Sequence, residues 1–396
     1  SEDTSITLAN IYLTMKTLKL LSAIGIIWAV SGCHATYTEP ADTLKDAYAE
    51  SFMMGCAISP FEISGRMPEA EELLLKHFNA LSPGNCLKAE SVHPKPGVWN
   101  FKAADEFVKF GLQNDMWILG HTLIWHNQSP EFYWVNEDGS PKTREELIET
   151  MRSHIETVAG RYTGKIDAWD VVNEIIGEFG EYRNKGWVKA FDGDGYEVVR
   201  NAFIFADRYA PDAELYYNDF NVWRPAHLDG IVTMVKKLQE EGIRIDGVGI
   251  QAHWGLNFPK NEYIIAAIDT FAALGVKVMI TEMDIDVLPL TKEGQIIGKA
   301  MQEPQFQLEE FEIFFDPYKD GLPADVQTEL TARYKELLQI FYDKRDKIDR
   351  VTFWGLHDSM SWKNDYPIPR RTNYPLLFNR DLTPKPAVEA ILSIPD

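Results

Sequence analysis

Residues 166–174 read IDAWDVVNE, a short run of apolar and β-branched residues that ends on a carboxylate. Runs of this kind are typical of strands buried on both faces, as in a parallel sheet. Seven further runs of apolar or aromatic residues occur along the chain. We therefore predict eight strands, at Phe52–Ile58, Phe78–Ser82, Met116–Trp125, Ile166–Asn173, Leu215–Phe220, Ile245–Trp254, Lys277–Ile285 and Val351–Leu356.

Segments with helical periodicity lie between these strands. Apolar residues recur at intervals of three and four at Leu147, Met151, Ile155 and Val158, and again at Ile231, Met234, Val235 and Leu238. Strands that alternate with helices pair in parallel through right-handed crossovers, and eight such units predict an α/β fold, a (β/α)8 TIM barrel with a single catalytic domain. A doubly wound open sheet is the alternative from spacing alone, but the chain has no G-x-G-x-x-G turn. The longest gap precedes Val351 and contains an irregular stretch, 287–321.

The composition bounds the possible partners. The chain has 396 residues, a net charge of −21, 45% hydrophobic residues and 11 Trp. This fraction of hydrophobic residues is typical of a globular protein. The negative charge disfavours nucleic acids and anionic substrates, because sites that bind them need clustered Lys and Arg. A neutral substrate fits, and the many Trp residues favour one with flat apolar faces. We expect a monomer.

Residues 16–33, KTLKLLSAIGIIWAVSGC, have the anatomy of a secretory signal, with Lys16 and Lys19 before an apolar run too short to span a bilayer comfortably. The end of this segment resembles a bacterial lipoprotein cleavage box, which predicts a lipid on Cys33. A plain signal or a buried helix is the alternative. We expect Met15 as the natural start, 1–14 as upstream residues without an interpretation, 15–33 as the lipoprotein signal, 34–44 as a tether and 45–394 as the catalytic domain. The expected location is secreted, periplasmic or at the cell surface, anchored to a bacterial outer membrane through Cys33 alone.

The two remaining cysteines, Cys56 and Cys86, lie in apolar strand-like contexts, which favours buried free thiols over a disulfide. The sequence has no C-x-x-C and no H-E-x-x-H, so we expect neither a metal nor a cofactor. It also has no G-x-S-x-G, which disfavours a serine hydrolase.

Barrel enzymes place their chemistry at the carboxyl ends of the strands, and polar or aromatic residues gather there. They are Asn85, Lys88, His121, Trp125, His126, Asn173, Glu174, Asn218, Asp219, Gln251, His253, Glu282, Asp284, Trp354, His357 and Asp358.

Glu174 and Glu282 follow buried residues of the fourth and seventh predicted strands. A carboxylate in that setting is costly unless it is paired or lies in a cleft, and either residue alone could be a salt-bridged structural Glu. Together they could face each other across the barrel mouth. Such a pair is what glycoside hydrolysis requires, one group protonated and one ionised.

Several motifs resemble glycoside hydrolase family 10, in matching order over roughly residues 45–394. They are WDVVNE at 169–174, ITEMD at 280–284, GHTLIWH at 120–126, GVGIQAH at 247–253, PYKDGLP at 317–323, Trp354-Gly355 with Ser361-Trp362, and TPKPA at 383–387. The resemblance implies a retaining endo-β-1,4-xylanase that acts on xylan or xylo-oligosaccharides. It assigns Glu174 as acid/base and Glu282 as nucleophile, with carboxyl groups about 5–5.5 Å apart.

The resemblance also implies roles for neighbouring residues. Asn173, expected on the other side of its strand end from Glu174, would bind the sugar 2-hydroxyl. His253 would hydrogen-bond the nucleophile, and Gln251 the substrate. Asp219 and Asp284 are expected to be structural. The sugar-binding residues upstream of the cut would be Asn85, Lys88, His121, Trp125, Trp354 and Trp362.

One departure from the family concerns the second strand. The family commonly has Glu-Asn-x-x-Lys-Trp there, whereas this chain has Gly84 and Ala89 at the outer positions. The upstream sugar site is therefore expected to be weaker or shaped for a different chain. The alternative functions are another retaining β-glycanase on the same fold, such as one that cuts β-glucan, and an inactive carbohydrate-binding lipoprotein. The presence of both Glu residues and His253 disfavours the latter.

Overall fold

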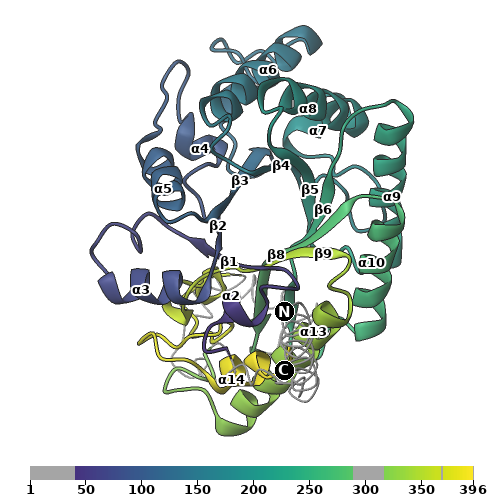
Figure 1. Ribbon diagram of the computed structural model, residues 1–396. Helices are drawn as coiled ribbons and strands as arrows, with labels where there is room; N and C mark the ends of the chain where they lie inside the picture. Colours follow the sequence, from purple (N-terminus) through teal and green to yellow (C-terminus); the bar gives the residue numbers. More distant parts are fainter. Residues whose placement is uncertain (1–40, 289–315, 367–368, 396) are drawn as a thin grey trace, which may run out of the picture. The chain divides into compact units, whose positions relative to one another are not determined.

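Eight parallel strands close into a barrel in the computed structural model, which describes residues 41–288, 316–366 and 369–395. Neighbouring strands follow the order β6-β5-β4-β3-β2-β1-β9-β8, and the pairing of β6 with β8 closes the ring (Figure 1). The predicted (β/α)8 barrel is thus confirmed. The strands are β1 Met53–Ile58, β2 Ala80–Pro83, β3 Trp117–Ile124, β4 Ala168–Asn173, β5 Glu214–Asp219, β6 Gly247–Ile250, β7 His253–Gly255, β8 Lys277–Asp286 and β9 Ile348–Phe353.

The sixth predicted strand, 245–254, is wrong as a single element. The structure divides it into β6, which belongs to the ring, and β7, which pairs only with β8 outside it. The chain leaves the ring at Gln251 and Ala252, where Ala252 has φ +61°. That left-handed backbone ends the strand in a way that an apolar pattern does not reveal.

Helices surround the ring, and most of them cross from one strand to the next (Figure 1). Both stretches of predicted helical periodicity are confirmed, as α6 and α9, with their apolar positions buried. A capping box between Thr143 and Glu146 begins α6. The α-helices are α2 Leu44–Ala47, α3 Pro68–His77, α4 Ala89–Val92, α5 Lys102–Gln113, α6 Arg144–Arg161, α7 Gly186–Ala190, α8 Gly195–Tyr209, α9 Pro225–Glu240, α10 Asn261–Ala273, α13 Ala324–Asp343 and α14 Pro386–Leu392; short 3-10 helices span η1 Glu131–Tyr133, η4 Asp358–Met360 and η5 Trp362–Asn364.

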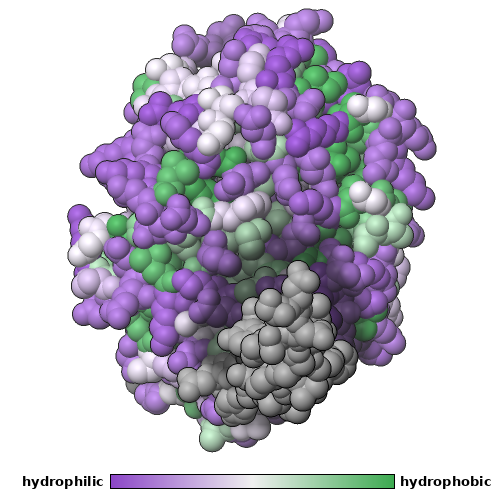
Figure 2. Space-filling model, viewed as in Figure 1, coloured by the Kyte–Doolittle hydropathy of each residue, from purple (hydrophilic) through white to green (hydrophobic). Residues whose placement is uncertain are grey.

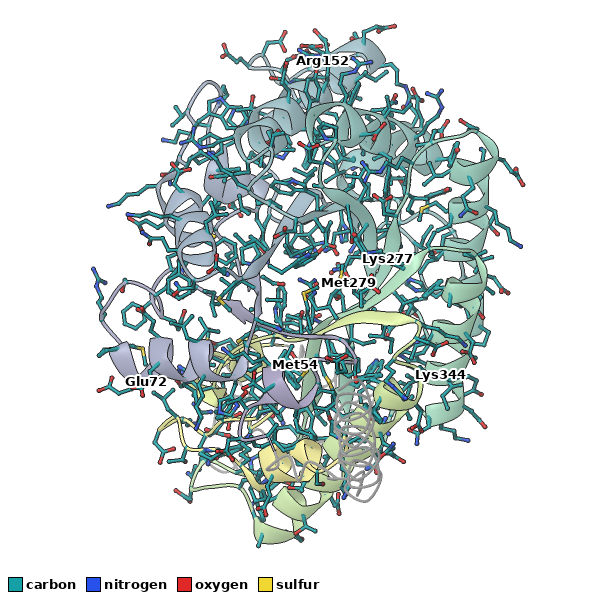
Figure 3. All side chains as sticks on the ribbon, viewed as in Figure 1. Met54, Glu72, Arg152, Lys277, Met279 and Lys344 are labelled. Carbon is teal, nitrogen blue, oxygen red and sulfur yellow. The ribbon has the colours of Figure 1, made fainter. Side chains whose placement is uncertain are left out.

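Alternate residues of each strand face opposite sides of the ring. Trp169 and Val171 of β4 pack outward into the large core shared with the helices, whereas Ala168 joins the small apolar cluster inside the barrel. Met279 belongs to the same inner cluster and lies at the centre of the molecule in Figure 3, while Arg152 lies at its periphery. This alternation determines which side chains can reach the barrel mouth.

Cys56 and Cys86 are buried free thiols, as predicted. The face of the molecule in Figure 2 is mainly hydrophilic, with scattered apolar residues. Within the described ranges no helix is long and apolar enough to cross a membrane. The predictions for 1–14, 15–33 and most of the tether lie outside the described residues, as does most of the irregular stretch before α13. The chain from Ala41 onward forms one compact unit.

Candidate active site

Glu174 lies at the barrel mouth, immediately after β4. Its backbone has φ +57°, a left-handed conformation that is uncommon outside glycine. Three side chains donate hydrogen bonds to its carboxyl group: Trp125 Nε1 to Oε2 at 3.0 Å, and Gln251 Nε2 and Asn173 Nδ2 to Oε1 at 3.0 and 3.2 Å. The side chain is only partly buried, so a ligand in the mouth can reach it.

The expected orientation of Asn173 is wrong. We expected its side chain on the other side of the strand end from Glu174, because successive strand residues alternate. The structure instead joins the two side chains by the 3.2 Å hydrogen bond. The left-handed backbone at Glu174 ends the strand's alternation and brings both side chains to the mouth.

Glu282 lies within β8 and is nearly buried, with 5% of its surface exposed. Asn218 Nδ2 donates to Oε1 at 2.7 Å, and Oε2 lies 3.1 Å from Nε2 of His253. Asn218 Oδ1 in turn accepts from Thr281 Oγ1 at 2.6 Å. Gly249 leaves room for this amide, since a Cβ there would lie 2.4 Å from Asn218 Oδ1.

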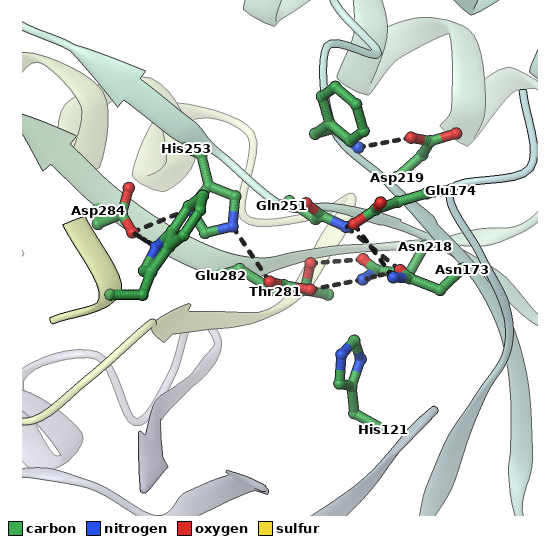
Figure 4. Close-up of polar contacts among 12 residues, drawn as sticks. His121, Asn173, Glu174, Asn218, Asp219, Gln251, His253, Thr281, Glu282 and Asp284 are labelled. Carbon is green, nitrogen blue, oxygen red and sulfur yellow. Dashed lines mark hydrogen bonds and ion pairs between the residues drawn. The ribbon is translucent and has the colours of Figure 1, made fainter. Parts of the chain in front are cut away.

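A chain of amides connects the two carboxyl groups across the mouth (Figure 4). Asn218 Nδ2 contacts both Glu282 and Asn173 Oδ1, the latter at 3.0 Å. Gln251 Nε2 contacts the same Asn173 oxygen at 3.2 Å and also Glu174. The prediction that Glu174 and Glu282 meet across the ring is thus supported by a continuous set of contacts from the ends of β4 and β5, from β8 and from Gln251, which follows β6.

The pKa values of the two carboxyl groups are shifted in opposite directions. Burial raises the pKa of Glu174, and the negative charges of Asp219 and Glu282 raise it further against the opposing donors. Burial would also raise the pKa of Glu282, but the hydrogen bond from His253 and the nearby imidazoles outweigh it and lower that pKa below its ordinary value. A proton is therefore held more tightly by Glu174 than by Glu282.

His253 is held between two carboxylates. Its Nδ1 lies 2.9 Å from Asp284 Oδ2, opposite the contact with Glu282. Trp362 Nε1 donates to the same Asp284 oxygen at 2.8 Å. Burial alone would lower the pKa of His253, but Asp284 and Glu282 raise it to about 9. The imidazole thus donates from both nitrogens, which fixes its orientation beneath Glu282.

A second group of predicted residues lies beside Trp125. Lys88 Nζ is 4.9 Å from the centre of the Trp125 ring and donates to Asn85 Oδ1 at 2.9 Å and Gln128 Oε1 at 3.0 Å. Burial lowers the pKa of Lys88, although Glu282 and Glu174 oppose that shift. A cation near an aromatic face, with amides around it, can bind sugar hydroxyls and a sugar ring together.

His121 lies inside the barrel, where its Nδ1 contacts Asp170 Oδ2 at 2.8 Å. Its ring packs edge-on against Trp354 at 5.3 Å. Trp354 follows β9 and is partly exposed, in contrast to the fully buried Trp169, and it also lies 6.4 Å from the His253 ring. These contacts join the two predicted catalytic carboxyl groups and the predicted sugar-binding residues into one connected cluster.

Sequence reasoning left three residues of this cluster without a role. Asn218 was noted only as a strand end, although its position two residues after Tyr216 places it on the inner face of β5. Asp170 has the same inner-face periodicity relative to Ala168, while Gln128 had no signal because it follows β3 in a loop. Among the described residues no group of three or more His, Cys, Asp or Glu is arranged to hold a metal ion.

A parallel barrel with two oppositely tuned carboxyl groups at the carboxyl ends of its strands defines a glycoside hydrolase of the TIM-barrel class. More specifically, the chain belongs to Glycosyl hydrolase family 10, whose sequence profile it matches over residues 43–394.

Known relatives agree with this assignment. The chain is 38% identical over 360 residues to endo-1,4-beta-xylanase A of Xylanibacter ruminicola, covering 91% of this chain and 95% of the relative. It is 38% identical over 347 residues to the beta-1,4-xylanase of Dictyoglomus thermophilum, covering 87% and 89%. Among solved structures, a GH10 endoxylanase from a sugarcane soil metagenome superposes with a TM-score of 0.81 at 38% identity, covering 90% of this chain and all of the other.

Proposed function

We propose that this chain is a retaining endo-β-1,4-xylanase that hydrolyses internal bonds of xylan by double displacement. The observation that carries the proposal is the pair of carboxyl groups connected across the barrel mouth by Asn218, Asn173 and Gln251. The pKa is raised for Glu174 and lowered for Glu282, which agrees with this geometry. Both relatives described above are named as xylanases, and each covers most of this chain. These names support xylan as the substrate.

In the first step, Glu282 attacks the anomeric carbon and forms an ester with the upstream sugar. The bond from that carbon to the leaving oxygen breaks, and Glu174 transfers its proton to that oxygen. His253 and Asn218 hold the attacking carboxylate, so the nucleophile is oriented before substrate arrives. Asn173 lies between the two groups, where it can bind the sugar 2-hydroxyl.

In the second step, Glu174 removes a proton from water as the water attacks the same carbon and the ester to Glu282 breaks. The negative charge of Glu282 is absent from the ester, and this charge is one of the causes that raise the pKa of Glu174. Esterification therefore lowers the pKa of Glu174 and makes it a better base for this step. We expect the carboxyl groups to lie about 5–5.5 Å apart, as this mechanism requires.

We propose that the upstream sugars bind between the Lys88–Asn85 group and the rings of Trp125, Trp354 and Trp362. Apolar sugar faces stack on aromatic rings, while hydroxyls need the polar groups beside them. Gly84 and Ala89 offer neither a carboxylate nor a ring to this site, so we expect the upstream site to bind sugar more weakly or to suit a different chain.

The experiment that tests the function is product analysis on xylan, arabinoxylan and β-glucan in parallel. We expect xylo-oligosaccharides from the xylans and much slower release from β-glucan. Proton NMR during the first turnovers should show the β-anomer, because two displacements retain configuration. Faster hydrolysis of β-glucan, or initial release of the α-anomer, would contradict the proposal.

We further propose a monomer that is exported and anchored to the outer membrane by a lipid on Cys33, through the segment outside the described residues. The support is the pattern of 16–33. Labelling with radioactive palmitate in the native cell tests it, with Cys33→Ser as the control that should lose the label. Recovery of the native protein from the cytosol would contradict the proposed location.

A further inference from the structure

Three fully buried side chains lie behind Glu174. Tyr217 and Asp219 come from β5, and His227 comes from α9. Tyr217 donates its hydroxyl proton to Asp219 Oδ2, and Nε2 of His227 lies 3.0 Å from that same oxygen. The backbone N–H of Phe220 donates to the other carboxyl oxygen at 2.8 Å. Buried polar groups are costly unless they are well paired, so this set requires a structural or functional reason.

The Tyr217 hydroxyl connects this set to the backbone around the acid/base. Its oxygen accepts the N–H groups of Ile175 at 3.2 Å and Ile176 at 3.1 Å, the two residues that follow Glu174. Arg183 holds the same segment from its other side, with Nε donating to the Glu174 carbonyl at 3.1 Å. A left-handed backbone is costly for a residue other than glycine and persists only where its surroundings enforce it. These contacts provide that enforcement.

We infer that Asp219, acting through Tyr217, is the positioning residue of the acid/base: it fixes the backbone turn at Glu174 and keeps a negative charge behind its carboxyl group. The inference rests on the proposed function of Glu174. Asp219 is fully buried, so it has no route to the substrate itself. The sequence pattern had indicated only a structural role for it.

The charge of Asp219 acts differently from that of Glu282. After burial itself, Asp219 is the largest cause that raises the pKa of Glu174, ahead of Glu282. The charge of Glu282 disappears in the glycosyl-enzyme, whereas that of Asp219 is unaffected by the reaction. Asp219 therefore supplies a constant contribution that keeps Glu174 protonated in the free enzyme. Charged groups near Glu174 also include Lys88 and Arg183. His227 is the titratable group that faces Asp219 itself.

The first test is the pH dependence of kcat/KM for Asp219→Asn on a xylo-oligosaccharide. The replacement keeps the shape and removes the charge. Without that charge the pKa of Glu174 falls, so the basic limb of the profile moves to lower pH. The position of this limb does not depend on how much of the protein is folded, and a purely structural role for Asp219 would not move it. A limb that coincides with that of the unmodified protein would overturn the inference.

The second test is Tyr217→Phe, which keeps the ring and removes the oxygen that holds the backbone. A misplacement of about 1 Å can cost roughly 100-fold in rate. We expect a loss of that order on a xylo-oligosaccharide and a smaller loss on an aryl β-xylobioside with a dinitrophenol leaving group, which needs little protonation. The matched control is Tyr216→Phe, since the Tyr216 hydroxyl donates to Glu214 at 2.9 Å at the other end of β5. It should leave both rates unchanged.

The results separate the inference from the proposed function. Failure of the unmodified protein to release xylo-oligosaccharides would contradict the proposed function itself. An active protein in which Tyr217→Phe loses the same factor on both substrates would overturn only the positioning role. This second measurement decides the positioning role even if Asp219→Asn yields no folded protein.

Discussion

Asn218 Nδ2 donates a hydrogen bond of 2.7 Å to Oε1 of Glu282. This bond is shorter than the 3.1 Å contact between His253 and the other oxygen of the same carboxylate. Asn218 is on β5 and Glu282 on β8, so the contact crosses the inside of the barrel past β6. A carboxylate with donors on both oxygens is favoured in its ionised form and has few orientations. The nucleophile is therefore ready for attack before a sugar binds.

Replacement of this nucleophile should abolish catalysis without loss of the fold. We expect Glu282→Ala to reduce kcat on xylan by on the order of 10⁶, the factor that removal of a nucleophile costs another covalent enzyme. The protein should still fold, with a lower thermal midpoint, because the buried His253 loses one of its two carboxylate partners. The exposed Glu262→Ala on α10 is the control and should keep full activity. Retained turnover by Glu282→Ala would contradict the nucleophile assignment.

Replacement of the acid/base should affect substrates according to their leaving groups. We expect Glu174→Ala to lower the rate on xylan by about 10²–10⁴-fold, the usual contribution of general acid–base catalysis. Aryl xylosides with good leaving groups should lose much less in the first step. Added azide should restore their turnover by attacking the glycosyl-enzyme without a base, while the unmodified protein should not respond. Equal losses on both kinds of substrate would rule out the acid role.

The stability of the protein should fall as His253 loses its proton. The folded-state pKa of about 9 lies above the ordinary value of 6.5, so its contribution is complete below pH 6.5 and is lost as the pH rises through 9. We expect a decrease in the free energy of unfolding on the order of 3 kcal/mol over this window. Urea unfolding of the unmodified protein and of His253→Gln at pH 6, 8 and 10 measures it. Identical pH dependence in both proteins would exclude His253 as the source.

Loss of the Lys88 charge should weaken the upstream sugar site. A hydrogen bond to a charged group is worth about 1.5–3 kcal/mol, so Lys88→Met should lower kcat/KM on aryl β-xylobioside by roughly 10–100-fold. The effect on an aryl xyloside with one sugar should be smaller, since its single ring occupies only the cleavage subsite. The exposed Lys102→Met on α5 serves as the control. The same loss on both substrates would place Lys88 at the cleavage subsite instead.

Gly120 of β3 should contribute to the stability of the fold. A Cβ on Gly120 would lie 2.2 Å from the Trp169 ring, which is fully buried on β4. We expect Gly120→Ala to cost about 1–3 kcal/mol or more through overpacking, measured as a lower thermal midpoint. Gly160→Ala is the control, because nothing lies within 4 Å of its added Cβ in α6 and alanine favours a helix. An unchanged midpoint for Gly120→Ala would show that Trp169 can move aside.

The strands of the barrel could be predicted because their residues are buried on both sides and read as continuous apolar runs. The last strand shows the limit of this signal. β9 begins at Ile348, three residues before the predicted start, because the charged Asp349 and Arg350 interrupt the apolar run. The division of 245–254 and the orientation of Asn173 depend on left-handed backbones at Ala252 and Glu174. Neither alanine nor glutamate favours that conformation, so the sequence does not mark these two positions.

The candidate site was predicted largely from residue types at strand ends, and the motif resemblance supplied the roles. Neither source identified the side chains from distant strands that hydrogen-bond these site residues. Asn218 and Asp170 act by contact with residues 64 and 49 positions away. Such pairs follow from the closure and register of the ring, and only coordinates establish them.

The chain between β6 and β8 takes part in the site without forming the wall of the barrel. Because β6 pairs directly with β8, the residues between these strands can be replaced while the ring stays closed. Substitution of Gln251 would change the acidity of Glu174, and substitution of His253 that of Glu282, and with them the working pH, on an unchanged scaffold. The stretch between β6 and β8 is therefore a place where the pH dependence of the enzyme can be engineered separately from the barrel.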